Sequence, residues 1–227
     1  MEQGKSHLLP PLWALYLGQA LLGALAFAAF WWVHTRYHLP WEALTRVGPP
    51  GQVLAFGIGG GAGLIAFVAA TYFLLLRRLP ERFWFDPAVL ALTELSGLHL
   101  VFLLLLTALI EETLFRAALQ NLLLLRLGSV PVAIGAAAAL FTGAHLRYLA
   151  RPLLAGMALI LGGALGWLYW YTGSLWTAVI AHFLYDLLAV QLLKKGWLLP
   201  KVPADLFARA ALPEKEESQP GEGRLKG

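Results

Sequence analysis

Residues 98–125 read LHLVFLLLLTALIEETLFRAALQNLLLL, a long apolar run with two adjacent acids, Glu111 and Glu112, and the basic Arg116 near its middle. A helix rises about 1.5 Å per residue, so about 20 residues cover the ~30 Å hydrocarbon core of a bilayer. Charged groups at that depth are costly, and they are functional candidates by default. The stretch therefore predicts a membrane-spanning helix that carries a polar site.

Five further apolar segments have lengths close to a membrane span. Three carry no charge (12–33, 53–76 and 152–171), one contains His145 (130–146), and one contains His182 and Asp186 (174–193). The predicted fold class is all-α, a polytopic membrane bundle of about six transmembrane helices. Residues 81–97, with Trp84 and Phe85, are predicted to form an interfacial amphipathic helix or a short re-entrant element.

The composition supports this class. The chain has 227 residues, of which 59% are hydrophobic and 13% are charged, and this balance excludes an ordinary soluble domain. Its net charge of +4 is scattered between apolar segments, so no nucleic-acid partner is expected. The absence of cysteine excludes thiolate nucleophiles and Cys-rich zinc sites. We predict one transmembrane domain over residues 1–200 and a disordered tail over 201–227.

Basic residues near the span ends predict the orientation, because Lys and Arg are retained on the cytoplasmic side. With the N-terminus inside, nine fall on the cytoplasmic side: Lys5, Arg77, Arg78, Arg82, Arg147, Arg151, Lys194, Lys195 and Lys201. Three fall outside: Arg36, Arg46 and Arg126. Both termini are therefore predicted to be cytoplasmic, and the tail would be a cytoplasmic tail.

The glycine-rich stretch GIGGGAG, residues 57–63, lies within an apolar span and matches no nucleotide-binding motif. Glycines four residues apart suit close contact between membrane helices. The pairs are Gly57 with Gly61, Gly59 with Gly63, and Gly162 with Gly166. We predict helix packing at these positions.

Glu111 and Glu112 have different expected roles. Glu112 and Arg116 are four residues apart, so they share one helix face and are predicted to form an ion pair. Glu111 lies about 100° away around an α-helix and has no obvious local partner. An unpaired buried carboxylate is a candidate general base.

Two other spans carry polar residues that could meet Glu111. His145 ends the run ALFTGAH, and His182 with Asp186 forms HFLYD, whose spacing places both side chains on one helix face. These groups could activate water by acid–base chemistry or could bind a divalent metal such as zinc. Both alternatives stay open at this level, and the metal ligand candidates would be Glu111, His145, His182 and Asp186.

Three motifs on these spans carry a family resemblance: EExxxR at Glu111, Glu112 and Arg116, then FxxxH at Phe141 and His145, and finally HxxxD at His182 and Asp186. In this order they resemble the CAAX protease and bacteriocin-processing family of intramembrane proteases, also called the CPBP or Abi family. The resemblance covers residues 98–193. It implies a hydrolase whose substrates are membrane-associated proteins or peptides.

The resemblance also implies roles for individual residues. Glu111 would activate water against the scissile carbonyl, and His145, His182 and Asp186 would complete the catalytic site. Glu112 and Arg116 would support it. Asp186 stands where eukaryotic relatives have asparagine. The six predicted spans are similar to prokaryotic members, so the resemblance implies an integral protein of a prokaryotic cell membrane.

Two other classes of function are compatible with buried acids and histidines. A catalytically silent relative would act as an immunity or partner-binding protein, but it would be expected to have lost a motif residue, and none is missing. A proton-coupled transporter would be expected to carry charges on more spans and to show an internal repeat of broken helices. An intramembrane endopeptidase is therefore the favoured prediction.

Overall fold

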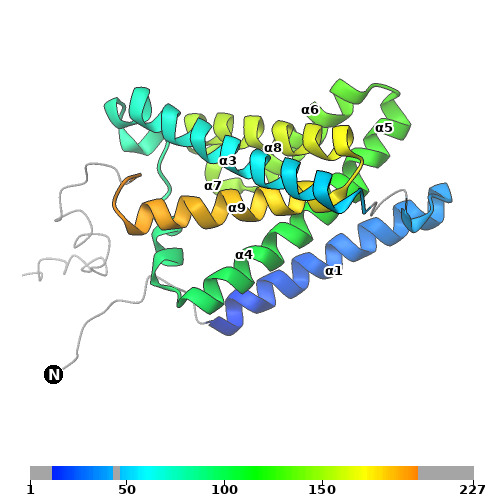
Figure 1. Cartoon of the computed structure of the whole chain (residues 1–227), viewed down its shortest axis with the longest axis horizontal. Coiled ribbons are helices and arrows are strands. Elements are labelled where there is room, and N and C mark those ends of the chain that lie inside the picture. The colour runs from blue at the N-terminus through cyan, green and yellow to red at the C-terminus, as the bar shows by residue number, and fades with distance from the viewer. Residues whose placement is uncertain (1–11, 43–46, 199–227) are drawn as a thin grey trace, which may run out of the picture. The chain divides into compact units, whose positions relative to one another are not determined.

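The computed structural model describes residues 12–42 and 47–198 of the chain. Its regular elements within these ranges are helices, and the same ranges contain no strand (Figure 1). The all-α prediction is confirmed for this part of the chain. The predicted tail, 201–227, lies outside the described residues.

The elements follow one another along the chain with short connections. In order they are α1 (Leu12–Tyr37), α3 (Pro50–Leu74), η1 (Leu76–Arg78), η2 (Glu81–Phe83), η3 (Pro87–Glu94), α4 (Gly97–Glu112), η4 (Thr113–Gln120), α5 (Asn121–Leu127), α6 (Val130–Ala144), α7 (Leu146–Leu149), α8 (Pro152–Thr172) and α9 (Leu175–Lys194). Proline lies in the first turn of α3, α6 and α8, where its missing N–H costs no helical hydrogen bond. Gly128 and Gly173 end α5 and α8 in the left-handed conformation, which glycine adopts without a Cβ clash.

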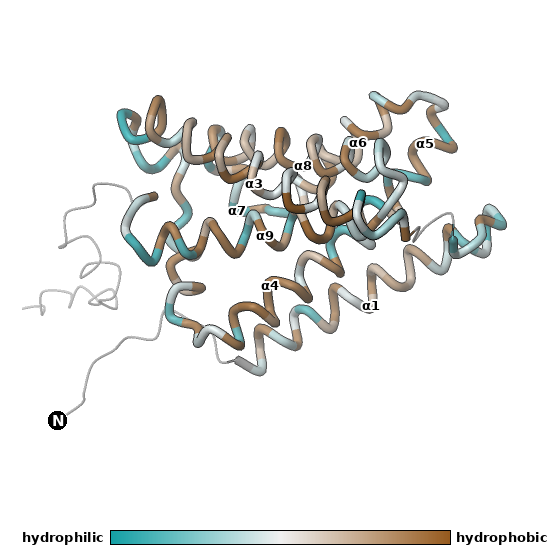
Figure 2. Tube along the Cα trace, in the orientation of Figure 1, coloured by the Kyte–Doolittle hydropathy of each residue, from teal (hydrophilic) through white to brown (hydrophobic). Residues whose placement is uncertain are grey.

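Five helical segments are long and apolar enough to cross a membrane. They are Trp13–Tyr37, Pro50–Arg78, Gly97–Leu127, Pro152–Thr172 and Leu175–Lys194. The sixth predicted span forms α6, an apolar helix of 15 residues, which reaches only about 22 Å at 1.5 Å per residue. Figure 2 shows hydrophobic residues along most of the helical length, with hydrophilic residues mainly near helix ends. The described part of the chain is thus a helical membrane bundle.

The segment predicted as an interfacial amphipathic helix or a short re-entrant element, residues 81–97, is not one continuous helix. It contains two short 3-10 helices, η2 and η3, separated by Trp84, Phe85 and Asp86. Pro87 begins η3, and the carboxylate of Asp86 accepts a hydrogen bond from the backbone N–H of Ala88 at 3.2 Å. Trp84 and Phe85 are buried among other side chains. A continuous amphipathic helix was therefore the wrong alternative, because proline and a local Asp cap break the segment, and the short re-entrant element stays a prediction.

The segment that contains the three central charges is not α-helical throughout. α4, η4 and α5 form one helical run, but η4 is a π-helix of eight residues. A π-helical insertion is rare and is frequently found at functional sites. Here it carries Arg116 and Gln120, and both side chains are buried. The sequence predicted a regular α-helix, since no residue type marks a π-helix.

α9 lies at the centre of the described bundle. It contacts α3, α4, α8, η3 and η4, and Figure 1 shows it running between α3 and α4. Its contact with α3 depends on glycine. A Cβ on Gly57 would lie 2.8 Å from Cγ2 of Ile180, and one on Gly61 would lie 2.8 Å from Cβ of Leu184. The predicted packing role is confirmed for these two positions.

Of the other two predicted glycine pairs, one packs as predicted and the other does not. At Gly59 and Gly63, no heavy atom lies within 4 Å of the position that a Cβ would take, so their predicted packing role was wrong. Both glycines are exposed, on the side of α3 that faces away from α9. Gly162 would place a Cβ 3.3 Å from Cδ1 of Phe141, and Gly166 would place one 2.7 Å from Oε1 of Gln120. This pair packs as predicted.

We expect Gly61→Ala to lower the thermal stability of the protein in detergent. The added methyl group would lie 3.0 Å from the carbonyl oxygen of Ala181 as well as close to Leu184, and such overpacking costs about 1–3 kcal/mol. Gly59→Ala, on the same helix with open space, is the matched control and should leave stability unchanged or slightly raised. Equal effects of the two substitutions would contradict a close α3–α9 contact at Gly61.

Candidate active site

The site is built around the carboxylate of Glu112, the last residue of α4. Its Oε2 accepts a hydrogen bond from Nε of Arg116 at 2.9 Å, and neither side chain is exposed. Its Oε1 accepts a second hydrogen bond, from Nδ1 of His182 on α9, also at 2.9 Å. The predicted ion pair is confirmed. The contact with His182 was not predicted, because spacing along one helix carries no information on a partner from another.

His182 presents its second nitrogen to two other acids. Since a carboxylate can only accept, the hydrogen bond to Glu112 places a proton on Nδ1 and fixes the ring orientation. Nε2 then lies 3.4 Å from Oδ2 of Asp186 and 3.9 Å from Oε2 of Glu111. The imidazole therefore lies between one carboxylate on its Nδ1 side and two on its Nε2 side.

Glu111 differs from its neighbour in the way the sequence predicts. It lies 3.9 Å from His182, which is longer than a hydrogen bond, and no other described side chain or backbone group hydrogen-bonds to its carboxylate. A small part of the Glu111 side chain is exposed, whereas none of Glu112 is. Glu111 is thus the carboxylate that remains available to bind another molecule.

His145 reaches the site from the end of α6. Its Nδ1 donates to the carbonyl oxygen of Phe141 at 2.9 Å, which leaves Nε2 for other contacts. The ring of Phe141 lies 4.8 Å from that of His145 and 6.2 Å from that of His182, measured between centroids. The two histidines therefore flank one phenylalanine. Phe141 also lies 5.5 Å from the Arg116 guanidinium carbon, a cation–π distance.

One cavity of about 350 Å³ joins these groups. Its polar lining includes all four predicted catalytic residues, Glu111, His145, His182 and Asp186. The rest of its wall is mainly aliphatic and aromatic, with Phe141, Tyr148 and Tyr185 among the aromatic residues. The structure thus brings together residues from α4, α6 and α9 that are far apart in the sequence. Their catalytic roles remain a prediction.

These groups do not form a ready metal site. A structural or catalytic zinc ion needs at least three protein ligands around one point. Among the described residues, no group of three or more His, Asp or Glu side chains is arranged to hold a metal ion. Glu112 engages Nδ1 of His182 and the Phe141 carbonyl engages Nδ1 of His145, so Nε2 is the nitrogen of each ring that is left for another group.

Tyr148 is a residue of the site that the sequence analysis missed. It lies on α7, just after His145, and its ring stacks on that imidazole at 4.9 Å with an interplanar angle of 19°. Burial, followed by the nearby charge of Asp186, raises the pKa of Tyr148 to about 12, so the hydroxyl keeps its proton at neutral pH. The sequence did contain a signal for Tyr148, because it follows His145, the histidine of the second motif, by three residues.

A larger apolar cavity, of about 640 Å³, adjoins the polar one. The two share lining residues, including His145, Tyr148 and Tyr185, while Trp84 and Phe85 lie on the wall of the larger cavity. The sequence analysis missed this cavity, because its wall combines the 3-10 segments with α3, α7, α8 and α9. An apolar chain of a bound molecule could therefore lie next to the polar groups.

Asp86 connects the wall of the larger cavity to α7. Its Oδ1 accepts a hydrogen bond from Nη2 of Arg147 at 2.8 Å and lies 3.6 Å from Nη2 of Arg151. Arg151 also donates through Nε to the carbonyl oxygen of Phe85 at 2.7 Å. The sequence analysis used both arginines only to predict orientation. In the structure both arginines also bind the segment before η3, through Asp86 and Phe85, and keep it beside His145.

Comparisons with known proteins agree with the predicted resemblance. The family model described as type II CAAX prenyl endopeptidase Rce1-like matches residues 93–188. The uncharacterized protein YpbD of Bacillus subtilis (strain 168) is 36% identical over 88 residues, which are 39% of this chain and 42% of that relative. The match thus spans less than half of either chain. No solved structure matches. The resemblance to the CAAX protease family is confirmed for residues 93–188.

We expect Glu112→Ala and Arg116→Ala each to lower the free energy of unfolding strongly, because each leaves an uncompensated charge in the interior. Breaking a buried pair costs about 3–5 kcal/mol. The double variant should lose less stability than the sum of the single losses, because no orphan charge from this pair remains. Denaturation of all four proteins in detergent gives the coupling between the two side chains.

The pair of Asp86 with Arg147 provides a control cycle, since the Arg147 side chain is 64% exposed. Its coupling should stay below about 1 kcal/mol. Additive losses at Glu112 and Arg116 would mean that the two side chains do not interact, and Glu112 would then return as a second candidate catalytic carboxylate.

Proposed function

Residues 93–188 match the Rce1-like family of type II CAAX prenyl endopeptidases, and on this basis we propose that the chain is an intramembrane endopeptidase. One observation carries the proposal: Glu111 and Nε2 of His182 face the same cavity, while Glu112 holds His182 from behind. A free carboxylate beside an oriented imidazole is the arrangement that water activation needs. Glu111, His182 and Asp186 lie within helices that are long and apolar enough to span a membrane.

Glu111 is the proposed general base. A water molecule between Glu111 and the scissile carbonyl gives a proton to the carboxylate, and its oxygen attacks the carbonyl carbon. The protonated Glu111 then gives this proton to the leaving amine nitrogen as the carbon–nitrogen bond breaks. The products are a carboxylic acid and an amine, so one water molecule is consumed and Glu111 returns to its initial state.

His182 is the proposed stabiliser of the oxyanion that forms during this attack. When doubly protonated, its ring donates to Glu112 through Nδ1 and to the cavity through Nε2. A donor that is already oriented loses little free energy to reorganisation in the transition state, which is the main source of electrostatic catalysis. His145 and Asp186 complete the polar wall, and we assign them to the binding of the water and the scissile carbonyl.

The arrangement assigns Glu112 and Arg116 a supporting role. Glu112 contacts neither of the two main cavities, and its two oxygens are both engaged. It therefore acts through His182, as the buried carboxylate of a hydrolase triad does. Arg116 in turn balances the charge of Glu112, so that Glu112 is not a second free carboxylate beside Glu111.

The proposed substrate is a membrane-associated protein or peptide. The helices around the polar cavity are long and apolar enough to span a membrane, so a peptide held at the bilayer would be close to the cavity. The adjoining apolar cavity, with Trp84 and Phe85, could receive a hydrophobic part of the same molecule. Arg147 and Arg151 support a cytoplasmic location for the His145 end of the bundle. With α6 as a sixth crossing, both termini lie on this side.

We expect Glu111→Gln to reduce the cleavage of a membrane-anchored peptide by at least about 100-fold, since general acid–base catalysis contributes 10²–10⁴. Thermal stability in detergent should stay the same or rise, because the substitution removes a buried charge that has no ion-pair partner within hydrogen-bond distance. Turnover is measured on any such peptide that the unaltered protein cleaves.

Glu94→Gln is the matched control, because Glu94 is an exposed acid on η3 outside both cavities. It should keep full activity. Retention of more than about a tenth of the turnover by Glu111→Gln would remove Glu111 from the role of base. Failure of the unaltered protein to cleave any membrane-anchored peptide would contradict the proposed function itself.

A further inference from the structure

The polar cavity of about 350 Å³ has a second polar wall, on α1 and α4, that the proposed reaction does not use. Gln19 of α1 and Thr107 of α4 line it together with Glu111. Thr107 precedes Glu111 by four residues, so the two side chains lie on one face of α4. Leu15 and Gln19 have the same spacing on α1, and both line the cavity. The sequence analysis missed Gln19 and Thr107, because it followed charged residues and histidines.

α1 and α4 pack side by side and run in the same direction along this wall (Figure 1). The ring of Tyr16 lies 6.0 Å from that of Phe102, measured between centroids. Further along both helices, a Cβ on Gly23 would lie 3.3 Å from Cδ1 of Ile110. Each of the two polar side chains lies between these contacts on its own helix. They are therefore within about one helical turn of each other along the bundle.

The polar atoms of this wall have no partner among the described residues. Oε1 of Gln19 is buried without a hydrogen bond. Nε2 of Gln19 and Oγ1 of Thr107 make no hydrogen bond either, but they are not enclosed. Polar groups inside a protein are usually paired, because an unpaired one is costly in apolar surroundings. These two open atoms are thus available to a molecule in the polar cavity.

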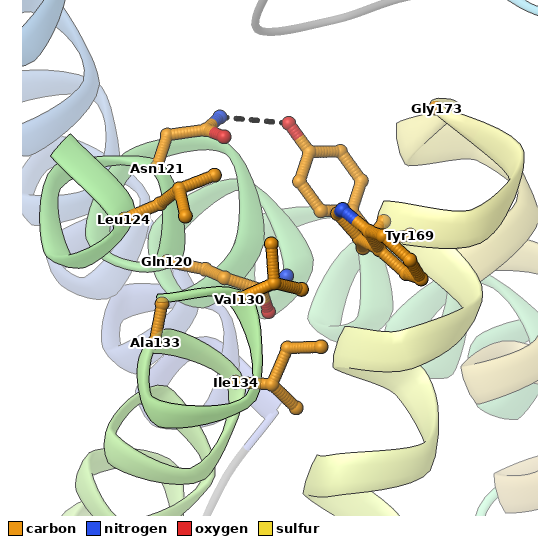
Figure 3. Close-up of a pocket in the computed structure, with 9 residues that line it drawn as sticks. Gln120, Asn121, Leu124, Val130, Ala133, Ile134, Tyr169 and Gly173 are labelled. Carbon is orange, nitrogen blue, oxygen red and sulfur yellow. Dashed lines mark hydrogen bonds between the residues drawn. The ribbon is translucent and has the colours of Figure 1, made fainter. Parts of the chain in front are cut away.

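The two other side-chain amides that are buried or partly buried in the described ranges are paired through their nitrogens. Gln120 donates through Nε2 to the carbonyl oxygen of Gly166 at 2.9 Å. Asn121 donates through Nδ2 to the hydroxyl oxygen of Tyr169 at 2.7 Å, as Figure 3 shows, and to the carbonyl oxygen of Ala117 at 3.0 Å. Both amides line a separate cavity of about 140 Å³. The unpaired amide nitrogen on α1 therefore differs from the other amides of the bundle.

A peptide backbone is the ligand that these two open atoms suit. In the interior of a membrane, each N–H and C=O of an extended peptide needs a partner, because bulk water is absent. A side-chain amide nitrogen donates to a carbonyl oxygen, and a threonine hydroxyl donates or accepts. Four residues of α4 advance about 6 Å, whereas an extended chain advances about 3.3 Å per residue. A peptide group beside Thr107 would thus lie about two residues from a bond beside Glu111.

We propose that Gln19 and Thr107 form a subsite for the backbone of a peptide substrate, about two residues from the bond that is cleaved. The position of that bond rests on the proposed function. The neighbouring wall is aliphatic, with Leu15, Leu103 and Leu104. The subsite therefore recognises the backbone, and peptides with different apolar side chains bind to it alike.

Binding to a protein that carries Glu111→Gln tests the subsite without cleavage. The probes are two palmitoylated, dansyl-labelled decapeptides, one of Ala and Leu and the other of Gly and Val. Their side chains have no hydrogen-bonding group, so Gln19 and Thr107 can bind only the backbone. Energy transfer from the tryptophans of the protein in nanodiscs measures Kd.

We expect Thr107→Val and Gln19→Leu, each added to Glu111→Gln, to raise the Kd of both peptides at least about threefold, since one lost hydrogen bond weakens binding about 2- to 12-fold. Thr107→Ser keeps the hydroxyl and should keep the Kd. Gln19→Leu should leave Tm unchanged or raise it, because it removes a buried oxygen that has no partner. Weaker binding together with a lower Tm would indicate a packing role and overturn the assignment of Gln19.

Thr71→Val and Gln191→Leu are the matched controls, because Thr71 and Gln191 line neither the polar nor the apolar cavity. Both should leave Kd unchanged. Equal Kd values for the subsite variants and the controls would overturn the subsite, and so would the absence of any binding. If the subsite variants weaken binding but the unaltered protein cleaves no membrane-anchored peptide, the subsite stands as a peptide-binding site and the proposed function fails.

Discussion

The arrangement of α4, η4 and α9 depends on the two hydrogen bonds that the carboxylate of Glu112 accepts. It is fully buried, and it accepts one hydrogen bond from Arg116 in the same helical run and one from His182 on α9. Charge-assisted hydrogen bonds of this kind are strong in a low-dielectric interior, but the desolvation of the charges opposes them. The contact therefore favours a single relative position of the two helices. A shift of either helix by one turn would leave a buried charge without its partner.

The apolar surroundings explain why the rest of the bundle supports this contact. α9 can carry His182 through the interior only if neighbouring helices exclude lipid from it. On one side, Gly57 and Gly61 allow α3 to approach closely. On the other side, the π-helix η4 places Gln120 against α8, where a Cβ on Gly166 would lie 2.7 Å from Oε1 of Gln120. Small residues and an irregular helix thus occur where polar groups must be accommodated.

The same constraint separates the two glutamates. Glu112 is engaged on both oxygens, so Glu111 is the acid that faces the cavity with His145 and Asp186. Two adjacent carboxylates thereby take different roles, one structural and one open to a ligand. The match of residues 93–188 to the Rce1-like family covers the elements that carry these side chains.

The sequence by itself determined the helical membrane class, the three motifs and the pairing of Glu112 with Arg116. These follow from hydropathy and from spacing within one helix, which act over a few residues. Only the tertiary structure decided that Glu112 also binds His182, that Tyr148 stacks on His145, and that α6 is shorter than a membrane span. Contacts between helices depend on crossing angles and on local breaks such as the π-helix, and periodicity along the chain does not encode either of them.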